Sequence, residues 1–142
     1  MKRLLAGIAV LVIVGCGNNS TPPKKEFTPP VDNKITTDKA DSYVQASKFL
    51  MEAIKKQETS LQKFIKRWKL SNDLSELSDS TYTEKNPQVV KSWNRLQDQW
   101  RRAELSAYDK ASLGEDEFNW IGGALADSIN IDIQSRIQKQ LQ

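Results

Sequence analysis

The sequence predicts an all-α fold, a small antiparallel bundle of about three helices behind a disordered tether. Apolar residues recur at helical spacing from Ala40 to Trp68, with no proline or glycine between them. A second stripe of the same kind follows Asn86-Pro87. Four of the five prolines instead fall before residue 38, in a polar segment. We therefore divide the chain into a leader (1–15), a tether (16–37) and a helical domain (38–142).

The leader has the composition of a secretory signal. Lys2 and Arg3 give it a positive start, and residues 4–14 form an unbroken apolar run. A membrane-spanning helix needs about 20 apolar residues, whereas the apolar part of a secretory signal has roughly 7 to 15. The run therefore indicates export rather than a membrane span.

The only cysteine of the chain stands at the end of this run, in Ile13-Val14-Gly15-Cys16. The motif resembles the lipobox of bacterial lipoproteins: an aliphatic residue, a variable position, a small residue and cysteine. The resemblance implies cleavage between Gly15 and Cys16, a diacylglyceryl group on the Cys16 sulfur and acylation of the new amino terminus. Two or three acyl chains hold a soluble domain firmly on a membrane. The alternative is that Cys16 is a small hydrophobe in a signal that is cleaved elsewhere or left uncleaved.

The resemblance also implies a location. The protein would be exported and anchored by lipid at the outer face of the cell membrane, or in the outer membrane of a Gram-negative species. Gly17 follows the cysteine, in place of the aspartate that retains some Gram-negative lipoproteins in the inner membrane. A lone cysteine forms no intramolecular disulfide, so we expect the domain to be stable without one.

Residues 17–37 have the composition of a tether, with two Pro-Pro pairs and mostly polar residues around them. Such a segment buries too little apolar surface to order itself. In polyproline II geometry, at about 3.1 Å per residue, it would extend up to about 60 Å from the lipid. The alternative is that Phe27 or Val31 docks on the helical domain.

The first helix is predicted from residue 38 to about residue 68, with Asp38 as its amino-terminal cap. Its apolar stripe weakens at Gln57 and Glu58, where we expect a wet core or a polar partner. A connecting loop should follow over 71–86, with at most one helical turn around Leu74 and Leu77.

The second helix is predicted over 87–113, with Asn86 as cap, Pro87 in the first turn and Gly114 as the stop. Ser112 and Glu115 have the spacing of a capping box for a third helix. Residues 129–133 alternate like a strand, but a lone strand would lack a partner, so we favour helix. Gly122-Gly123 would lower helix stability, or permit close packing or a bend.

The overall charge gives no argument for a nucleic-acid partner, and we expect none. Without Lys2 and Arg3 the formal net charge falls from +3 to +1. Locally, Lys55, Lys56 and Lys63 lie on the first helix away from its apolar stripe. They are a candidate surface for anionic headgroups or wall polymers, or simply a solvated face.

The residue inventory argues against an enzyme. The chain has no histidine, and lipid would consume its single thiol. These absences remove Ser-His-Asp and Cys-His arrangements and the usual zinc sites. Glu115, Asp116 and Glu117 leave carboxylate catalysis formally open. The simpler interpretation is that they favour the start of a helix.

Trp93 and Trp100 lie seven residues apart, about 10 Å along one helix face. They are candidates for the core or for a recognition surface that binds sugar rings or a partner helix.

We therefore expect a membrane-anchored lipoprotein that presents a non-catalytic helical module to another envelope protein or, because its heptads favour self-association, to a second copy. The alternative is a protein that binds a cell-wall or surface glycan through exposed aromatic residues. We expect no cofactor, metal or nucleic acid, and contact with the membrane through the lipid anchor.

Overall fold

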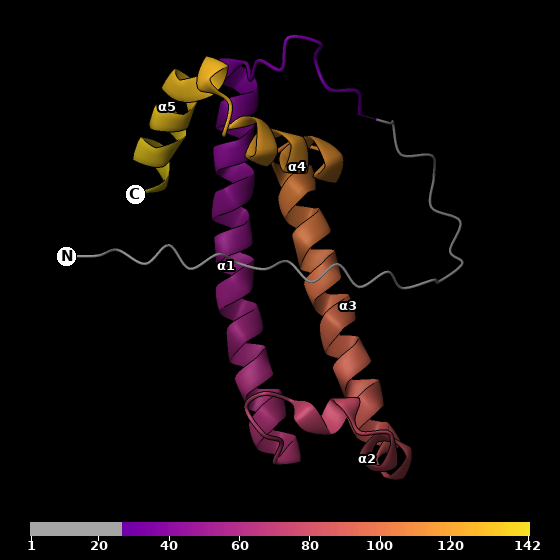
Figure 1. Ribbon diagram of the computed structural model, residues 1–142. Helices are drawn as coiled ribbons and strands as arrows, with labels where there is room; N and C mark the ends of the chain where they lie inside the picture. Colours follow the sequence, from indigo (N-terminus) through magenta and orange to yellow (C-terminus); the bar gives the residue numbers. More distant parts are fainter. Residues whose placement is uncertain (1–26) are drawn as a thin grey trace, which may run out of the picture.

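The computed structural model describes residues 27–142, and these residues are helical with no strand among them (Figure 1). The predicted lipidation residue Cys16 and the cleavage residue Gly15 lie outside this range. Two long antiparallel helices, α1 and α3, lie side by side along the molecule, and shorter helices cover their two ends (Figure 1). The elements are α1 (Thr37–Trp68), the 3₁₀ turn η1 (Ser75–Ser78), α2 (Ser80–Lys85), α3 (Pro87–Lys110), α4 (Glu115–Ala124), the 3₁₀ turn η2 (Ser128–Asn130) and α5 (Ile131–Leu141).

α1 matches the predicted first helix within a residue at each end, but its cap differs. The Thr36 hydroxyl accepts a hydrogen bond from the Lys39 N–H at 3.4 Å, so the prediction of Asp38 as cap is wrong. Asp38 lies in the first turn, where its charge favours the helix dipole. The helix ends where Lys69 adopts a left-handed conformation and its N–H bonds the Ile65 carbonyl.

The predicted loop over 71–86 contains η1 at the expected turn and one helix that was not predicted, α2. Asp79 caps α2, accepting hydrogen bonds from the N–H groups of Thr81 and Tyr82. Glu76 closes the preceding turn by accepting from the N–H and the hydroxyl of Ser71. Side-chain acceptors thus give this polar segment a defined structure.

α3 begins at Pro87 as predicted and ends at Lys110, before the expected stop. Asn86 makes no capping bond, because its side chain donates to the Tyr82 carbonyl at 2.8 Å. Ser112, two residues after the helix, takes a left-handed conformation (φ 53°). Gly114 instead precedes α4 in an extended conformation, so the predicted glycine stop and the predicted capping box at Ser112 are both wrong.

The last segment is helical, as favoured, but it forms two helices joined by η2. The strand alternative for 129–133 is wrong. Asn130, only 2 % exposed, explains the break. Its amide donates at 2.9 Å to the carbonyls of Ala124 and Asn33, and its oxygen accepts from the Ile35 N–H at 3.0 Å. This side chain therefore ends α4 and also fixes the segment before α1.

That segment differs from the tether prediction, because residues 27–36 pack on the helical domain. Ile35 is buried, the Phe27 ring lies 5.4 Å from that of Trp120, and Asn33 bonds both Trp120 and Asp127. The tether prediction now applies only to residues before Phe27, which lie outside the described range. Of the two residues proposed for docking, Phe27 docks and Val31 is fully exposed.

The core consists of two separate clusters, one at each end of the α1–α3 hairpin. We name them the upper core, between the first half of α1, the end of α3, α4 and α5, and the lower core, between the end of α1, the start of α3 and the connecting turn. No buried residue lies between Ala46 and Phe64 on α1, or between Leu96 and Ala107 on α3. The weakening expected at Gln57 and Glu58 therefore extends over the whole middle of the hairpin.

Candidate binding groove between α1 and α3

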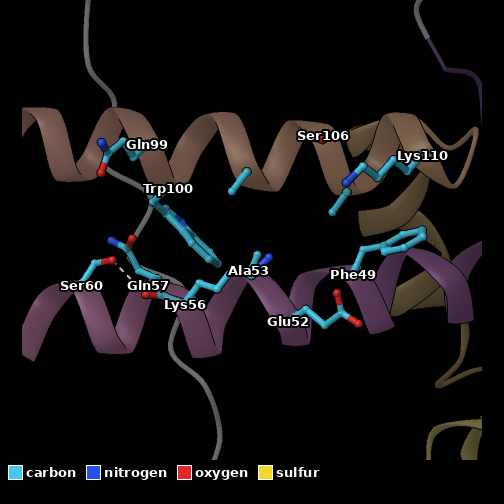
Figure 2. A pocket seen from close by; sticks show the side chains of 12 residues that line it. Phe49, Glu52, Ala53, Lys56, Gln57, Ser60, Gln99, Trp100, Ser106 and Lys110 are labelled. Atoms are coloured by element: carbon cyan, nitrogen blue, oxygen red, sulfur yellow. Dashed lines mark hydrogen bonds between the residues drawn. The ribbon is translucent and has the colours of Figure 1, made fainter.

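A groove runs along one side of the hairpin, from the middle, where the core is interrupted, to the edge of the lower core, where Phe64 and Leu96 line it. It consists of two adjoining hollows of about 280 and 250 Å³, which share Ser60 and Gln99 as lining residues. Figure 2 shows the upper hollow, lined by side chains from α1 and from α3. We name the two hollows together the hairpin groove.

Each long helix contributes one line of residues to the hairpin groove. The α1 line recurs at alternating intervals of four and three residues, and the α3 line at intervals of three or four. Residues at such intervals lie on one face of a helix. The α1 line is Phe49, Ala53, Lys56, Ser60, Lys63 and Arg67, and the α3 line is Ser92, Arg95, Gln99, Ala103, Ser106 and Lys110.

Trp100 and small side chains form the bottom of the upper hollow. Trp100 is half-buried, and Figure 2 shows it projecting from α3 toward α1, opposite Ala53 and Gln57. Ala103 and Ala107 continue this surface along α3. At the upper end, the Lys110 ammonium lies 5.5 Å from the centre of the Phe49 ring, within the range of a cation–π contact.

The hairpin groove is strongly cationic. Five cations line it against one carboxylate, that of Glu52. Within residues 27–142, none of the five takes part in an ion pair, whereas Lys39, Arg101 and Arg136 all do. Cations gathered along a concave surface create a positive potential that attracts anionic groups. The five are Lys56, Lys63, Arg67, Arg95 and Lys110.

The structure separates the site residues that the sequence singled out. Lys56, Lys63 and Trp100 come together in the hairpin groove. Lys55 is exposed on α1 outside the groove. Trp93 packs against the lower core, with its ring 5.5 Å from that of Phe64.

Sequence reasoning missed the cations that α3 contributes. Arg95 and Lys110 follow the same intervals of three and four residues as Gln99, so the pattern was present in the sequence. Its meaning depends on which face of α3 lies beside α1, and that is a property of the packed hairpin.

Trp68 adds an unusual feature to the lower hollow. Its Nε1 atom is buried and has no hydrogen-bond partner within the described part of the chain. The Arg67 guanidinium lies 5.2 Å from the centre of the same indole ring. A buried donor without an acceptor destabilises a fold by roughly 1–3 kcal/mol.

The acidic triplet at the start of α4 is largely engaged in ion pairs. Arg101 bonds both carboxylate oxygens of Glu115, at 2.9 and 2.7 Å, and also bonds Glu104. Lys39 pairs with Glu117 at 2.7 Å. These contacts tie α4 to α3 and α1, which is a structural role.

Tyr108 lies in the same cluster. Burial, and then the nearby carboxylates of Glu104 and Glu115, raise the pKa of Tyr108 to about 12. The Tyr108 hydroxyl donates a hydrogen bond to Glu104 at 3.3 Å. The phenol is therefore neutral at physiological pH.

Within residues 27–142, no group of three or more Asp, Glu, His or Cys side chains is placed to hold a metal ion. No helix of this range is long and apolar enough to cross a bilayer. Comparison of the chain with protein-family models, with curated proteins and with solved structures gives no match.

Proposed function

We propose that the protein is a lipid-anchored bacterial lipoprotein whose helical domain is a non-catalytic module that binds another envelope protein through the hairpin groove. One observation carries the binding site: five cations that form no ion pair within residues 27–142 line one groove, which runs from the middle of the hairpin to the edge of the lower core. Like charges along a concave surface focus a positive potential, which raises the local concentration of anionic groups.

Size favours a segment of a macromolecule over a small molecule. Sites for small molecules are typically clefts of roughly 300–1,000 Å³ that enclose the ligand. The two hollows here, of about 280 and 250 Å³, are joined end to end between the helices and do not form one enclosing cleft. A chain that lies along the hairpin would contact both hollows at once.

The proposed anchor rests on the lipobox resemblance of Ile13-Val14-Gly15-Cys16. Because Phe27 packs on Trp120, only residues 17–26 would separate the lipid from the docked segment. Ten residues extend at most about 35 Å. The domain would therefore stay close to the membrane surface, and so would its partner.

The proposal of a non-catalytic role is supported by the state of the carboxylates most open to catalysis. Glu115 and Glu117 both form ion pairs, and the chain has no histidine to act as a base. A carboxylate pair that catalyses hydrolysis instead needs one acid and one base facing a cleft.

Binding of a wall or surface glycan is the second candidate. It is favoured by the half-buried Trp100 ring, which lies near the amides of Gln57 and Gln99 and the hydroxyl of Ser60. Aromatic faces combined with amide and hydroxyl groups are suited to sugars. The cations of the groove would then contact phosphate or carboxylate groups of the polymer.

A photo-crosslinking residue at Ser60 tests the proposal in intact envelopes. We expect one defined protein adduct from Ser60 and none from the same residue at Lys55, on another face of α1. Cys16→Ala should release the protein from the membrane fraction and abolish the adduct, and mass spectrometry should find acyl chains on Cys16 only in the parent. No adduct from Ser60, or an unmodified thiol in the native protein, would refute the proposal.

A further inference from the structure

We infer that the hairpin groove binds an acidic amphipathic helix of the partner protein, which lies along α1 and α3 as a third helix. This inference rests on the proposed function and names the chemistry of the partner. It rests on the shape of the groove, on the small and aromatic side chains at its bottom, and on the cations along both of its sides.

The shape follows from how the two ends of the hairpin are covered. α4 and α5 pack on the upper end, and η1 and α2 close the lower end (Figure 1). Between these two ends, residues 47–63 of α1 and 97–106 of α3 include no buried residue. The α1 line runs from Phe49 to Arg67, about 27 Å at 1.5 Å per residue, which is the length of about five helical turns.

The bottom of the groove allows a helix to come close. Ala53, Ala103 and Ala107 are small, and the distance between packed helices is set by the side chains at the contact. Trp100 and Phe49 add aromatic surface, which dominates the binding energy of many interfaces. A helix with a narrow apolar stripe meets both requirements.

The cations stand on both sides of this surface. Lys56, Lys63 and Arg67 lie along α1. Arg95 and Lys110 lie along α3. A partner helix would therefore carry acidic residues on both flanks of its apolar stripe, as in coiled coils whose flanking charges select the partner.

Neither the amino-terminal segment of the chain nor α4 or α5 of a second copy offers a suitable acidic helix. After the proposed cleavage, residues 16–26 carry Lys24 and Lys25 against Glu26, so their charge opposes binding. The α4 acids Glu115 and Glu117 are already paired. α5 carries one acid, Asp132, against Arg136 and Lys139. Charge complementarity therefore assigns the groove to a different protein.

The test uses the full lipidated chain in a non-ionic detergent and a synthetic 18-residue peptide as probe. The peptide has a Leu/Ala stripe flanked by glutamates on both sides and is labelled for fluorescence anisotropy. We expect it to bind, and a scrambled peptide of the same composition to bind about tenfold more weakly because its acids and apolar residues no longer form separate faces. A lysine-for-glutamate version should not bind.

Charge reversal on the protein locates the site. The triple variant Lys56→Glu/Lys63→Glu/Arg95→Glu should weaken binding by about tenfold or more, because three exposed attractions become repulsions. The matched control Lys48→Glu/Lys55→Glu/Lys66→Glu makes the same change in net charge at exposed positions outside the groove. It should change affinity by no more than about threefold, through long-range steering alone. Circular dichroism checks that both variants remain helical.

Three outcomes would overturn the inference. The first is equal binding of the amphipathic and scrambled peptides. The second is equal weakening by the two triple variants. The third is competition by inorganic polyphosphate as strong as that by the peptide, which would indicate a general polyanion site. If any of these occurs while the Ser60 adduct still forms in envelopes, the proposed function stands and only the acidic helix is wrong.

Discussion

The upper end of the hairpin and its middle use the same kinds of residue for different purposes. At the upper end, cations are paired: Arg101 with Glu104 and Glu115, and Lys39 with Glu117. Along the hairpin groove, the five cations are unpaired within the described residues. Buried side chains follow the same division, since Ile121 is fully enclosed at the upper end whereas Met51 and Ile54 are 42 % and 47 % exposed.

This contrast between the upper end and the middle indicates which part of the molecule supplies stability. Burial of apolar area is the main favourable term in folding, so the two cores should hold the helices together. The middle of the hairpin contributes little burial and is free to carry unpaired charge. Binding residues are therefore placed where their substitution should leave the fold nearly unchanged.

We expect the greatest loss of stability from a cavity in the upper core. Ile121→Ala should lower the free energy of unfolding by about 2–5 kcal/mol, because it removes a fully buried side chain and leaves a cavity. Met51→Ala, in the exposed middle, should lower it by less than about 1 kcal/mol. Urea unfolding of both variants checks the comparison, and losses of equal size would show that the middle is not the weakly packed region.

A smaller effect is expected at the link between the upper core and the segment before α1. Asn130→Ala should lower stability by about 2 kcal/mol, because the Ile35 N–H and the carbonyls of Asn33 and Ala124 lose their buried partner. Residues 27–36 should then become accessible to limited proteolysis. Asn119→Ala, exposed on α4, is the matched control and should change neither property. An Asn130 variant as protease-resistant as the parent would contradict this role.

Tyr108 makes the stability of the upper end depend on pH. Its pKa is about 12 in the folded chain, above the ordinary value of 10.0, so the unfolded chain loses this proton first. The stabilisation that the protonated Tyr108 gives the folded chain is therefore complete below pH 10 and is lost as pH rises toward 12. Tyr108→Phe should reduce the fall in the free energy of unfolding between pH 10 and pH 12, measured by urea unfolding at each pH. An unchanged fall would show that Tyr108 is not the group responsible.

The smallest effect is expected beside the groove. Trp68→Phe removes a buried N–H that has no partner within residues 27–142, and it also removes some packing, so the two changes should offset each other to within about 1 kcal/mol. Thermal unfolding measures the difference. A loss of several kcal/mol would mean that the indole N–H has an acceptor in solution.

The sequence predicted what local periodicity determines. The stripe from Ala40 to Trp68 and the start at Pro87 yielded the two long helices, because both features depend on residues close in the chain. The break between α4 and α5 was missed, because it depends on Asn130 bonding to Asn33 and Ile35, more than ninety residues away in the sequence. The docking of Phe27 on Trp120 likewise depends on a contact between residues far apart in the chain.

The candidate site was predictable in part. Lys56, Lys63 and Trp100 were singled out by residue type and helical position. The choice between Trp93 and Trp100 required the packed hairpin, since both lie on one side of α3 and only Trp93 meets Phe64 in the lower core. The contribution of Arg95 and Lys110 required the relative rotation of the two helices.

Amine labelling of native envelopes can show whether the hairpin groove is the surface that a partner covers. The reactivity of each lysine in isolated envelopes is compared with that in the purified full chain by mass spectrometry. We predict that Lys56, Lys63 and Lys110 become protected in the envelope, whereas Lys48, Lys55 and Lys66 react equally in both. Equal reactivity of the two sets in both samples would show that the hairpin groove is an uncovered, solvated face.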